Sequence, residues 1–182
     1  MATIARDLHM AASIASFWGL SRSLTLLDDP TGLLETTDDL PALAARAVGL
    51  GMRVSLVTNG FTLTPERSDT LAAAGVGTVF LSIDAADAAA HEANRGLKGV
   101  IPRIRTANAQ LKQRGLKTVA SVTINHLIGD FRALARFLAE LGFSTVTFSY
   151  PKRTLHSSSQ VFSATSPQYP SGSLSERACW SA

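Results

Sequence analysis

The sequence has 182 residues, 46% of them hydrophobic and 17% charged, which suits one ordinary globular domain with a tail. The net charge is +3, and Lys152, Arg153 and Arg177 against Glu176 put two of these charges in the last 31 residues. The remaining body is close to neutral, so the charge does not indicate a nucleic-acid surface.

Neither a membrane span nor a disulfide framework is expected. The longest early run without charge covers residues 10–21, and a bilayer span needs about 20 apolar residues. One cysteine, Cys179, allows no intrachain disulfide and no cysteine-based metal site. A cytoplasmic protein that binds neither nucleic acid nor membrane is the expectation.

Along the chain, short apolar runs alternate with helical segments. The runs are rich in β-branched residues, which favours buried strands. The segments between them carry apolar residues at three- and four-residue spacing, as at Ile101, Ile104 and Leu111. The predicted strands are 24–27, 54–57, 78–83, 118–124 and 145–149, and the predicted helices are 39–50, 65–74, 99–114 and 130–141.

The residues between these elements agree with that order. Thr64 followed by Pro65 predicts an N-cap with proline in the first helical turn. A glycine follows each predicted helix, where a left-handed C-cap is expected. Four strand–helix units in series predict a parallel sheet with right-handed crossovers. The periodicity leaves both an open sheet and a barrel possible.

The pattern stops after residue 151. Residues 152–182 contain nine serines and two prolines and show neither a helical nor a strand period. This composition is typical of a flexible tail. The predicted organisation is therefore one folded domain at 1–151 and a flexible serine-rich tail at 152–182.

Polar residues follow the predicted strands, at the edge where parallel α/β folds form their sites. One such group, Thr58-Asn59-Gly60, is by itself typical of turn chemistry. Five strand ends of this kind together predict a polar pocket for a hydroxyl-rich ligand. The groups are Asp28-Asp29-Pro30, Thr58-Asn59-Gly60, Ser82 with Asp84, Asn125-His126, and Ser149-Tyr150-Pro151.

These residues resemble the central part of radical S-adenosylmethionine (radical SAM) enzymes. That family has a strand ending in Thr-Asn-Gly, then a helix ending in Ala-Gly-Val, as at 74–76 here. A strand with Ser-Ile-Asp and a His…Arg-Gly-x-x-Gly segment follow, as at 82–84 and at His91 with 95–99. The resemblance covers about residues 24–151 and depends on the order of the motifs.

The resemblance implies a partial parallel (β/α) barrel of about five strands with the first strand missing, an α/β fold. In the family, a CxxxCxxC loop holds a 4Fe-4S cluster, which cleaves S-adenosylmethionine to a 5′-deoxyadenosyl radical. By the resemblance, Ser82 and Asp84 are cofactor-binding residues, with Ser82 facing the ribose. Thr58 and Asn59 would line the methionine end or the substrate. Asn125 would lie on the cofactor's far side, and Arg95 would reach a carboxylate or the substrate.

Each assignment has a structural alternative. Ser82 and Asp84 could simply finish a strand, and Arg95 could be a solvated or salt-bridged surface arginine. His91 is not expected to be a ligand. His126, at a strand end, is a candidate acid or base.

The sequence departs from the family in two places. Where the family has Gly-Gly-Glu-Pro, this chain has Leu27-Asp28-Asp29-Pro30, so Asp29 could supply the carboxylate but both glycines are replaced. The CxxxCxxC loop is absent, and Cys179 alone cannot hold a cluster. No metal ligand is therefore assigned, and S-adenosylmethionine binding is expected to be weak or lost.

These departures favour a truncated or degenerate radical SAM domain that is inactive alone, and they leave its status as an enzyme open. The alternative is a non-catalytic module that binds a nucleoside-like ligand or a protein. An unrelated barrel enzyme lacks support, since no phosphate loop, metal-binding spacing or Gly-x-Ser-x-Gly elbow is present. The substrate stays unknown. Self-association through exposed strand edges is also expected.

Overall fold

The fold is described from a computed structural model, in which residues 23–27 and 39–150 are described. The chain divides into two compact units, Met1–Pro151 and Lys152–Ala182. The second unit lies outside the described residues, and so does the flexibility predicted for it. Asp28, Asp29 and Pro30 lie outside them as well.

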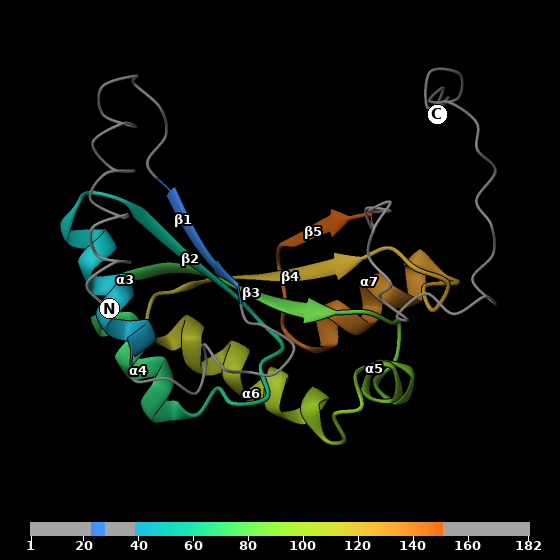
Figure 1. Ribbon diagram of the computed structural model, residues 1–182. Coiled ribbons are helices and arrows are strands. Elements are labelled where there is room, and N and C mark those ends of the chain that lie inside the picture. Colours follow the sequence, from blue (N-terminus) through green and yellow to red (C-terminus); the bar gives the residue numbers. More distant parts are fainter. Residues whose placement is uncertain (1–22, 28–38, 151–182) are drawn as a thin grey trace, which may run out of the picture. The chain divides into compact units, whose positions relative to one another are not determined.

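Five parallel strands form the sheet of a half-barrel, in the same order as in the chain (Figure 1). Each strand pairs in parallel with the next along its length. The strands are β1 (Ser23–Leu27), β2 (Arg53–Thr58), β3 (Val76–Ile83), β4 (Lys117–Thr123) and β5 (Val146–Ser149). The α/β fold and the partial parallel barrel predicted from the sequence are confirmed.

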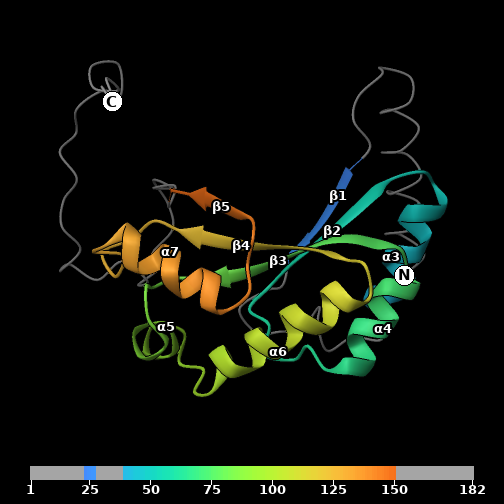
Figure 2. The same ribbon diagram turned by 180° about the vertical axis from the view of Figure 1, so that it is seen from behind.

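The helices cover one face of the sheet (Figures 1 and 2). Four of them lie close to their predicted positions, and α5, between β3 and α6, was not predicted as an element. Only His91 among the α5 residues is buried, so the segment has no apolar period that could reveal it. The helices are α3 (Asp39–Gly49), α4 (Pro65–Ala73), α5 (Ala88–Arg95), α6 (Val100–Gln113) and α7 (Phe131–Glu140).

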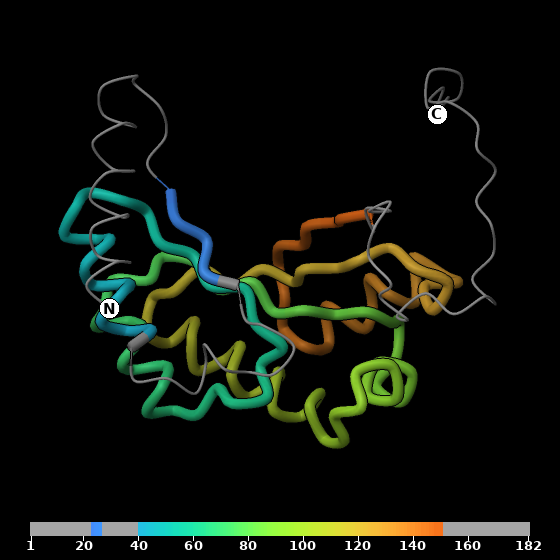
Figure 3. The backbone as a smooth tube through the Cα atoms, viewed as in Figure 1, coloured from blue at the N-terminus to red at the C-terminus, as the bar shows by residue number. Residues whose placement is uncertain are grey.

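The predicted helix boundaries have the expected physical causes. The Thr64 hydroxyl accepts a hydrogen bond from the Arg67 amide at 3.3 Å, which caps α4 at its N-terminus. Gly75 follows α4 with a φ of 81°, in the left-handed region. A Cβ on Gly75 would also lie 3.1 Å from the Val48 side chain. This glycine therefore lets the chain leave α4 and enter β3 beside α3. Figure 3 traces the path of the backbone through these elements.

Alternation along the strands gives the sheet two different faces. In β3, Val79, Leu81 and Ile83 are fully buried beneath the helices, and their neighbours Phe80 and Ser82 are only half-buried. The half-buried set points away from the helices. We call the strand side chains on this side the open face, and no helix in the described part of the chain covers it (Figures 1 and 2).

Candidate functional site

Hydroxyl groups gather on the open face near the carboxyl ends of β3, β4 and β5. The strand register places Ser82 beside Ser121 and Ser121 beside Thr147. One step further along, Thr123 lies beside Ser149, and their hydroxyl oxygens are 3.3 Å apart. All five side chains are half-buried or exposed. We call them the hydroxyl cluster; it forms a polar wall that can donate and accept hydrogen bonds.

Sequence reasoning identified Ser82 and Ser149 at strand ends but did not single out Ser121, Thr123 and Thr147. The missing information was the register between strands, because pairing decides which residues become neighbours across a sheet. The alternation within β4, with Val122 buried and its neighbours half-buried, carries part of this signal. It could have placed Ser121 and Thr123 on one face.

The Thr58-Asn59-Gly60 group forms the turn that ends β2. The Thr58 side chain is 1% exposed and accepts a hydrogen bond from the Gly60 amide at 2.9 Å. The Asn59 side chain accepts one from the Phe61 amide at 2.8 Å. Gly60 has a φ of 78°, and a Cβ there would come within 3.0 Å of Leu81 and Ile104. These contacts shape the turn, and the alternation of β2 points Thr58 toward the helices.

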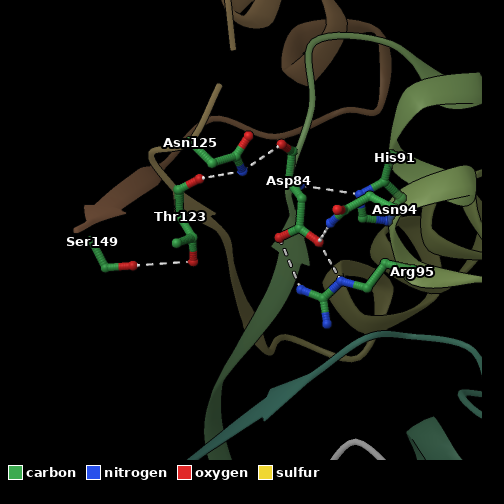
Figure 4. Close-up of polar contacts among 7 residues, drawn as sticks. All are labelled: Asp84, His91, Asn94, Arg95, Thr123, Asn125 and Ser149. Atoms are coloured by element: carbon green, nitrogen blue, oxygen red, sulfur yellow. Dashed lines mark hydrogen bonds and ion pairs between the residues drawn. The ribbon is translucent and has the colours of Figure 1, made fainter. Parts of the chain in front are cut away.

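Asp84 follows β3 and forms a bidentate ion pair with Arg95 of α5 (Figure 4). Arg95 Nη2 donates to Asp84 Oδ1 at 2.9 Å, and Arg95 Nε donates to Oδ2. Asn94 Nδ2 also donates to Oδ2, at 3.2 Å. The Asp84 side chain is 8% exposed and that of Arg95 is 31% exposed. Arg95 is thus salt-bridged to Asp84, and its contact with a carboxylate or the substrate stays a prediction.

The backbone of Asp84 is held from both sides as well (Figure 4). Its amide donates to Nδ1 of His91 at 3.1 Å, and its carbonyl accepts from Asn125 Nδ2 at 2.9 Å. Asn125 Nδ2 also donates to the Thr123 carbonyl, and Asn125 Oδ1 accepts from the Leu127 amide. Asp84 thus joins the end of β3 to α5 and to the segment that leaves β4. We call Asp84, His91, Asn94, Arg95 and Asn125 the Asp84 network.

Burial governs the electrostatics of His91. Its side chain is 1% exposed, and desolvation lowers its pKa below the ordinary value. Asp84 and Glu92 act in the opposite direction, and Arg95 adds to the lowering. The lowered pKa favours the neutral imidazole, which is the form that can accept a hydrogen bond from the Asp84 amide at Nδ1.

The predicted site residues thus fall into separate groups. Asp84, Arg95 and Asn125 belong to one network (Figure 4). Ser82 lies two residues before Asp84, on the open face. Thr58 and Asn59 form a turn at the same end of the sheet, since Thr58 pairs with Leu81. His126 is exposed in the segment after β4. Asp29 lies outside the described residues.

Two further properties concern the described residues alone. Within 23–27 and 39–150, no three His, Cys, Asp or Glu side chains come together as a metal site. In the same part of the chain, none of the helices has the length and apolar character needed to cross a membrane.

Comparison with known proteins agrees with this architecture. Residues 5–138 match the family model described as the Radical SAM superfamily. An AdoMet-dependent heme synthase of Nitratidesulfovibrio vulgaris is 28% identical over 130 residues, which cover 69% of this chain and 35% of that protein. A PqqA peptide cyclase of Streptomyces rochei is 38% identical over 87 residues, covering 48% of this chain and 24% of that protein.

A solved structure shares the fold. The crystal structure of Streptococcus suis SuiB bound to S-adenosylmethionine superposes with a TM-score of 0.57 at 17% identity. The match covers 81% of this chain and 34% of SuiB. The chain thus spans about a third of the length of SuiB and of the heme synthase.

Proposed function

Because this chain belongs to the radical SAM superfamily, we propose that its open face binds S-adenosylmethionine. The proposed contact is between the ribose of the cofactor and the hydroxyl cluster, and Ser82 is the residue proposed to make the main hydrogen bond. A ribose presents two neighbouring hydroxyls, and serine and threonine hydroxyls can both donate to them and accept from them. The observation that carries the proposal is this cluster at the carboxyl ends of β3, β4 and β5.

The Asp84 network supports this wall rather than contacting the ligand. Both carboxylate oxygens of Asp84 accept hydrogen bonds, and both polar atoms of the Asn125 side chain have protein partners. The oxygens keep further lone pairs, but both N–H donors of the Asn125 side chain are in use, and a ligand contact that displaced one of these partners would cost about 1–3 kcal/mol if a buried group were left without a bond. We therefore propose positioning roles for Asp84, Arg95 and Asn125, and turn-forming roles for Thr58 and Asn59.

The contact proposed for the amino-acid end of S-adenosylmethionine rests on sequence alone. Asp29 could accept from the amino group, as the family's glutamate does, but the glycines beside that glutamate are replaced here. We propose that this end of the cofactor is held weakly.

The 4Fe-4S cluster of the family does not fit the residues of this chain. Such clusters are held by cysteine thiolates, and the 182 residues contain Cys179 alone. We propose that the chain by itself starts no radical chemistry and contributes a cofactor-facing wall. The substrate is left open, and a cytoplasmic location is part of the same proposal.

The single cysteine also favours a second candidate function, a non-catalytic module that binds a nucleoside. The two candidates differ in the part of the ligand that contributes to affinity. If the chain retains S-adenosylmethionine recognition, the cofactor should bind more tightly than 5′-deoxyadenosine. Equal affinity for both would favour the nucleoside module.

We expect the affinity for 5′-deoxyadenosine to be weak and to depend on Ser82. A few neutral hydrogen bonds of about 1 kcal/mol each lead to dissociation constants of about 1 mM. Ser82→Ala should weaken binding about fivefold, because it removes one such bond. Ser55→Ala is the matched control, since Ser55 lies nearer the amino end of the same face, beside Thr25 and Thr78, and should change nothing.

Titration calorimetry with 5′-deoxyadenosine measures the affinities of the unchanged chain, Ser82→Ala and Ser55→Ala. Micromolar binding that survives Ser82→Ala would contradict the assignment. Equal losses in Ser82→Ala and Ser55→Ala would also contradict it, because the effect would then not be specific to the carboxyl end of the face.

A further inference from the structure

The hydrogen bond between Asp84 and His91 joins a backbone amide to a buried imidazole. The imidazole accepts the amide of Asp84 at Nδ1, 3.1 Å away, and its side chain is 1% exposed. An imidazole nitrogen can accept only when it carries no proton, so the bond assigns the neutral ring with its proton on Nε2. His91 is therefore fixed in one protonation state and one tautomer by a backbone group.

The backbone amide of Asp84 has no hydrogen-bond partner in the ladder between β3 and β4. The ladder between β3 and β4 ends at the pair Ile83 and Val122, so Asp84 is the first residue beyond it. A buried amide without a partner costs about 1–3 kcal/mol. His91 takes over where the sheet stops, and it reaches across seven residues from α5 to do so.

The carbonyl of Asp84 is held in the same way from the other side. Asn125 bridges this carbonyl and that of Thr123, both at 2.9 Å, and so ties the end of β3 to the end of β4. The hydroxyl cluster lies just before these two points, with Ser82 two residues before Asp84. Two of the three strands that carry the cluster, β3 and β4, are therefore tied together where they end.

We infer that His91 is a positioning residue for the ligand-facing wall: by accepting the Asp84 amide, it holds the end of β3 so that Ser82 keeps its place on the open face. His91 does not touch the ligand. The inference rests on the proposed function in that Ser82 is taken to face the ribose. Its structural core, the bond from Asp84 to His91, can be tested without any ligand.

A purely space-filling role for His91 makes the opposite prediction, and two substitutions separate the two roles. His91→Leu keeps the buried bulk but removes the acceptor. His91→Asn loses part of the bulk but keeps an acceptor, because Oδ1 of asparagine lies the same number of bonds from Cβ as Nδ1 of histidine. A positioning role requires the acceptor, and a packing role requires the bulk.

Amide hydrogen exchange of the folded chain, followed by NMR, measures the effect at Asp84 directly. In His91→Leu we expect the Asp84 amide to exchange about tenfold faster relative to the Leu81 amide, as the loss of one hydrogen bond allows. In His91→Asn the protection should be close to that of the unchanged chain. The affinity for 5′-deoxyadenosine should fall severalfold in His91→Leu and recover in His91→Asn.

The reverse order, with the leucine variant protected and the asparagine variant exposed, would overturn the inference, and so would equal exchange in both. If either variant fails to fold, the unchanged chain decides the matter through the nitrogen shifts of His91. An unprotonated Nδ1 with a coupling across the hydrogen bond to the Asp84 amide supports the inference, and a protonated Nδ1 overturns it. If the amides exchange as expected in both variants but 5′-deoxyadenosine does not bind, the proposed function is contradicted. The role of His91 at the end of β3 then still stands.

Discussion

Anaerobic reconstitution of the 182-residue chain with iron and sulfide is expected to yield no stoichiometric iron–sulfur cluster. The physical reason is the number of thiolates, because the sequence offers Cys179 alone and the clusters of this family require several. Among the described residues, no three His, Cys, Asp or Glu side chains come together as a metal site. Iron and sulfide analysis after desalting, with the visible absorption spectrum, measures the outcome.

A matched control separates specific from adventitious iron. Cys179→Ser removes the sole thiol, so iron that still binds to this variant is not held by cysteine. We expect both proteins to retain the same small amount of iron and to cleave no S-adenosylmethionine under reducing conditions. Stoichiometric iron and sulfide in the unchanged chain, lost in Cys179→Ser, would show that Cys179 takes part in a cluster.

The chain is also expected to self-associate through the edges of its sheet. In the described part of the chain β1 and β5 are the outer strands, and an outer strand presents backbone groups that can pair with another molecule. Within residues 23–27 and 39–150 no further strand pairs with β5, and its edge is apolar, with Val146 40% and Phe148 47% exposed. A second copy of the chain, aligned edge to edge, would cover these groups.

A groove beside β5 strengthens this expectation. It has a volume of about 180 Å³ and lies between β5 and α7, which are seen from behind in Figure 2. Phe131 of α7, 53% exposed, packs edge-to-face against Phe148, with 6.1 Å between the ring centroids. Apolar side chains at a mutual edge would be removed from water on dimerisation, which stabilises the pair by about 25 cal/mol per Å² of buried apolar surface.

Light scattering coupled to size-exclusion chromatography, over a range of concentrations, tests the association. The apparent mass should rise with concentration, and Thr25→Lys on β1 or Val146→Lys on β5 should restore the monomer, because a lysine on an edge strand opposes pairing. Val48→Lys is the control. Val48 is 37% exposed on helix α3, so a lysine there adds the same charge away from both edges. A monomer at every concentration would contradict the expectation. A Val48→Lys variant that dissociates as readily as the edge variants would show that net charge, rather than edge pairing, is responsible.

Local patterns predicted most of the fold because the strands and helices have local causes. The apolar runs, the Thr64 cap and the glycine after α4 each act within a few residues, and each lies where it was expected. Helix α5 was missed for a physical reason as well. Its eight residues bury a single histidine and carry no apolar stripe. The contacts that hold it are the cap from Asp87, the bonds to the end of β3 and those from Glu92 to the start of α6.

The candidate site could be predicted only in part, since its contacts join distant residues. Asp84 and Asn125 are 41 positions apart, and their hydrogen bond depends on how β3 and β4 pair. The sequence placed both residues at strand ends but could not show that they satisfy each other. The same limit applies to Ser121 and Thr147, which join Ser82 through the register of three strands.

The most direct test of the binding proposal is an NMR titration with 5′-deoxyadenosine that maps where the ligand lies. At about 5 mM ligand, several times the expected dissociation constant, we predict shifts at the amides of Ser82, Ser121 and Thr123. The amides of Ser55 and Thr78, nearer the amino end of the same face, should stay in place. Shifts confined to the helix-covered side of the sheet, or no shifts at that concentration, would contradict a cofactor-facing wall on the open face.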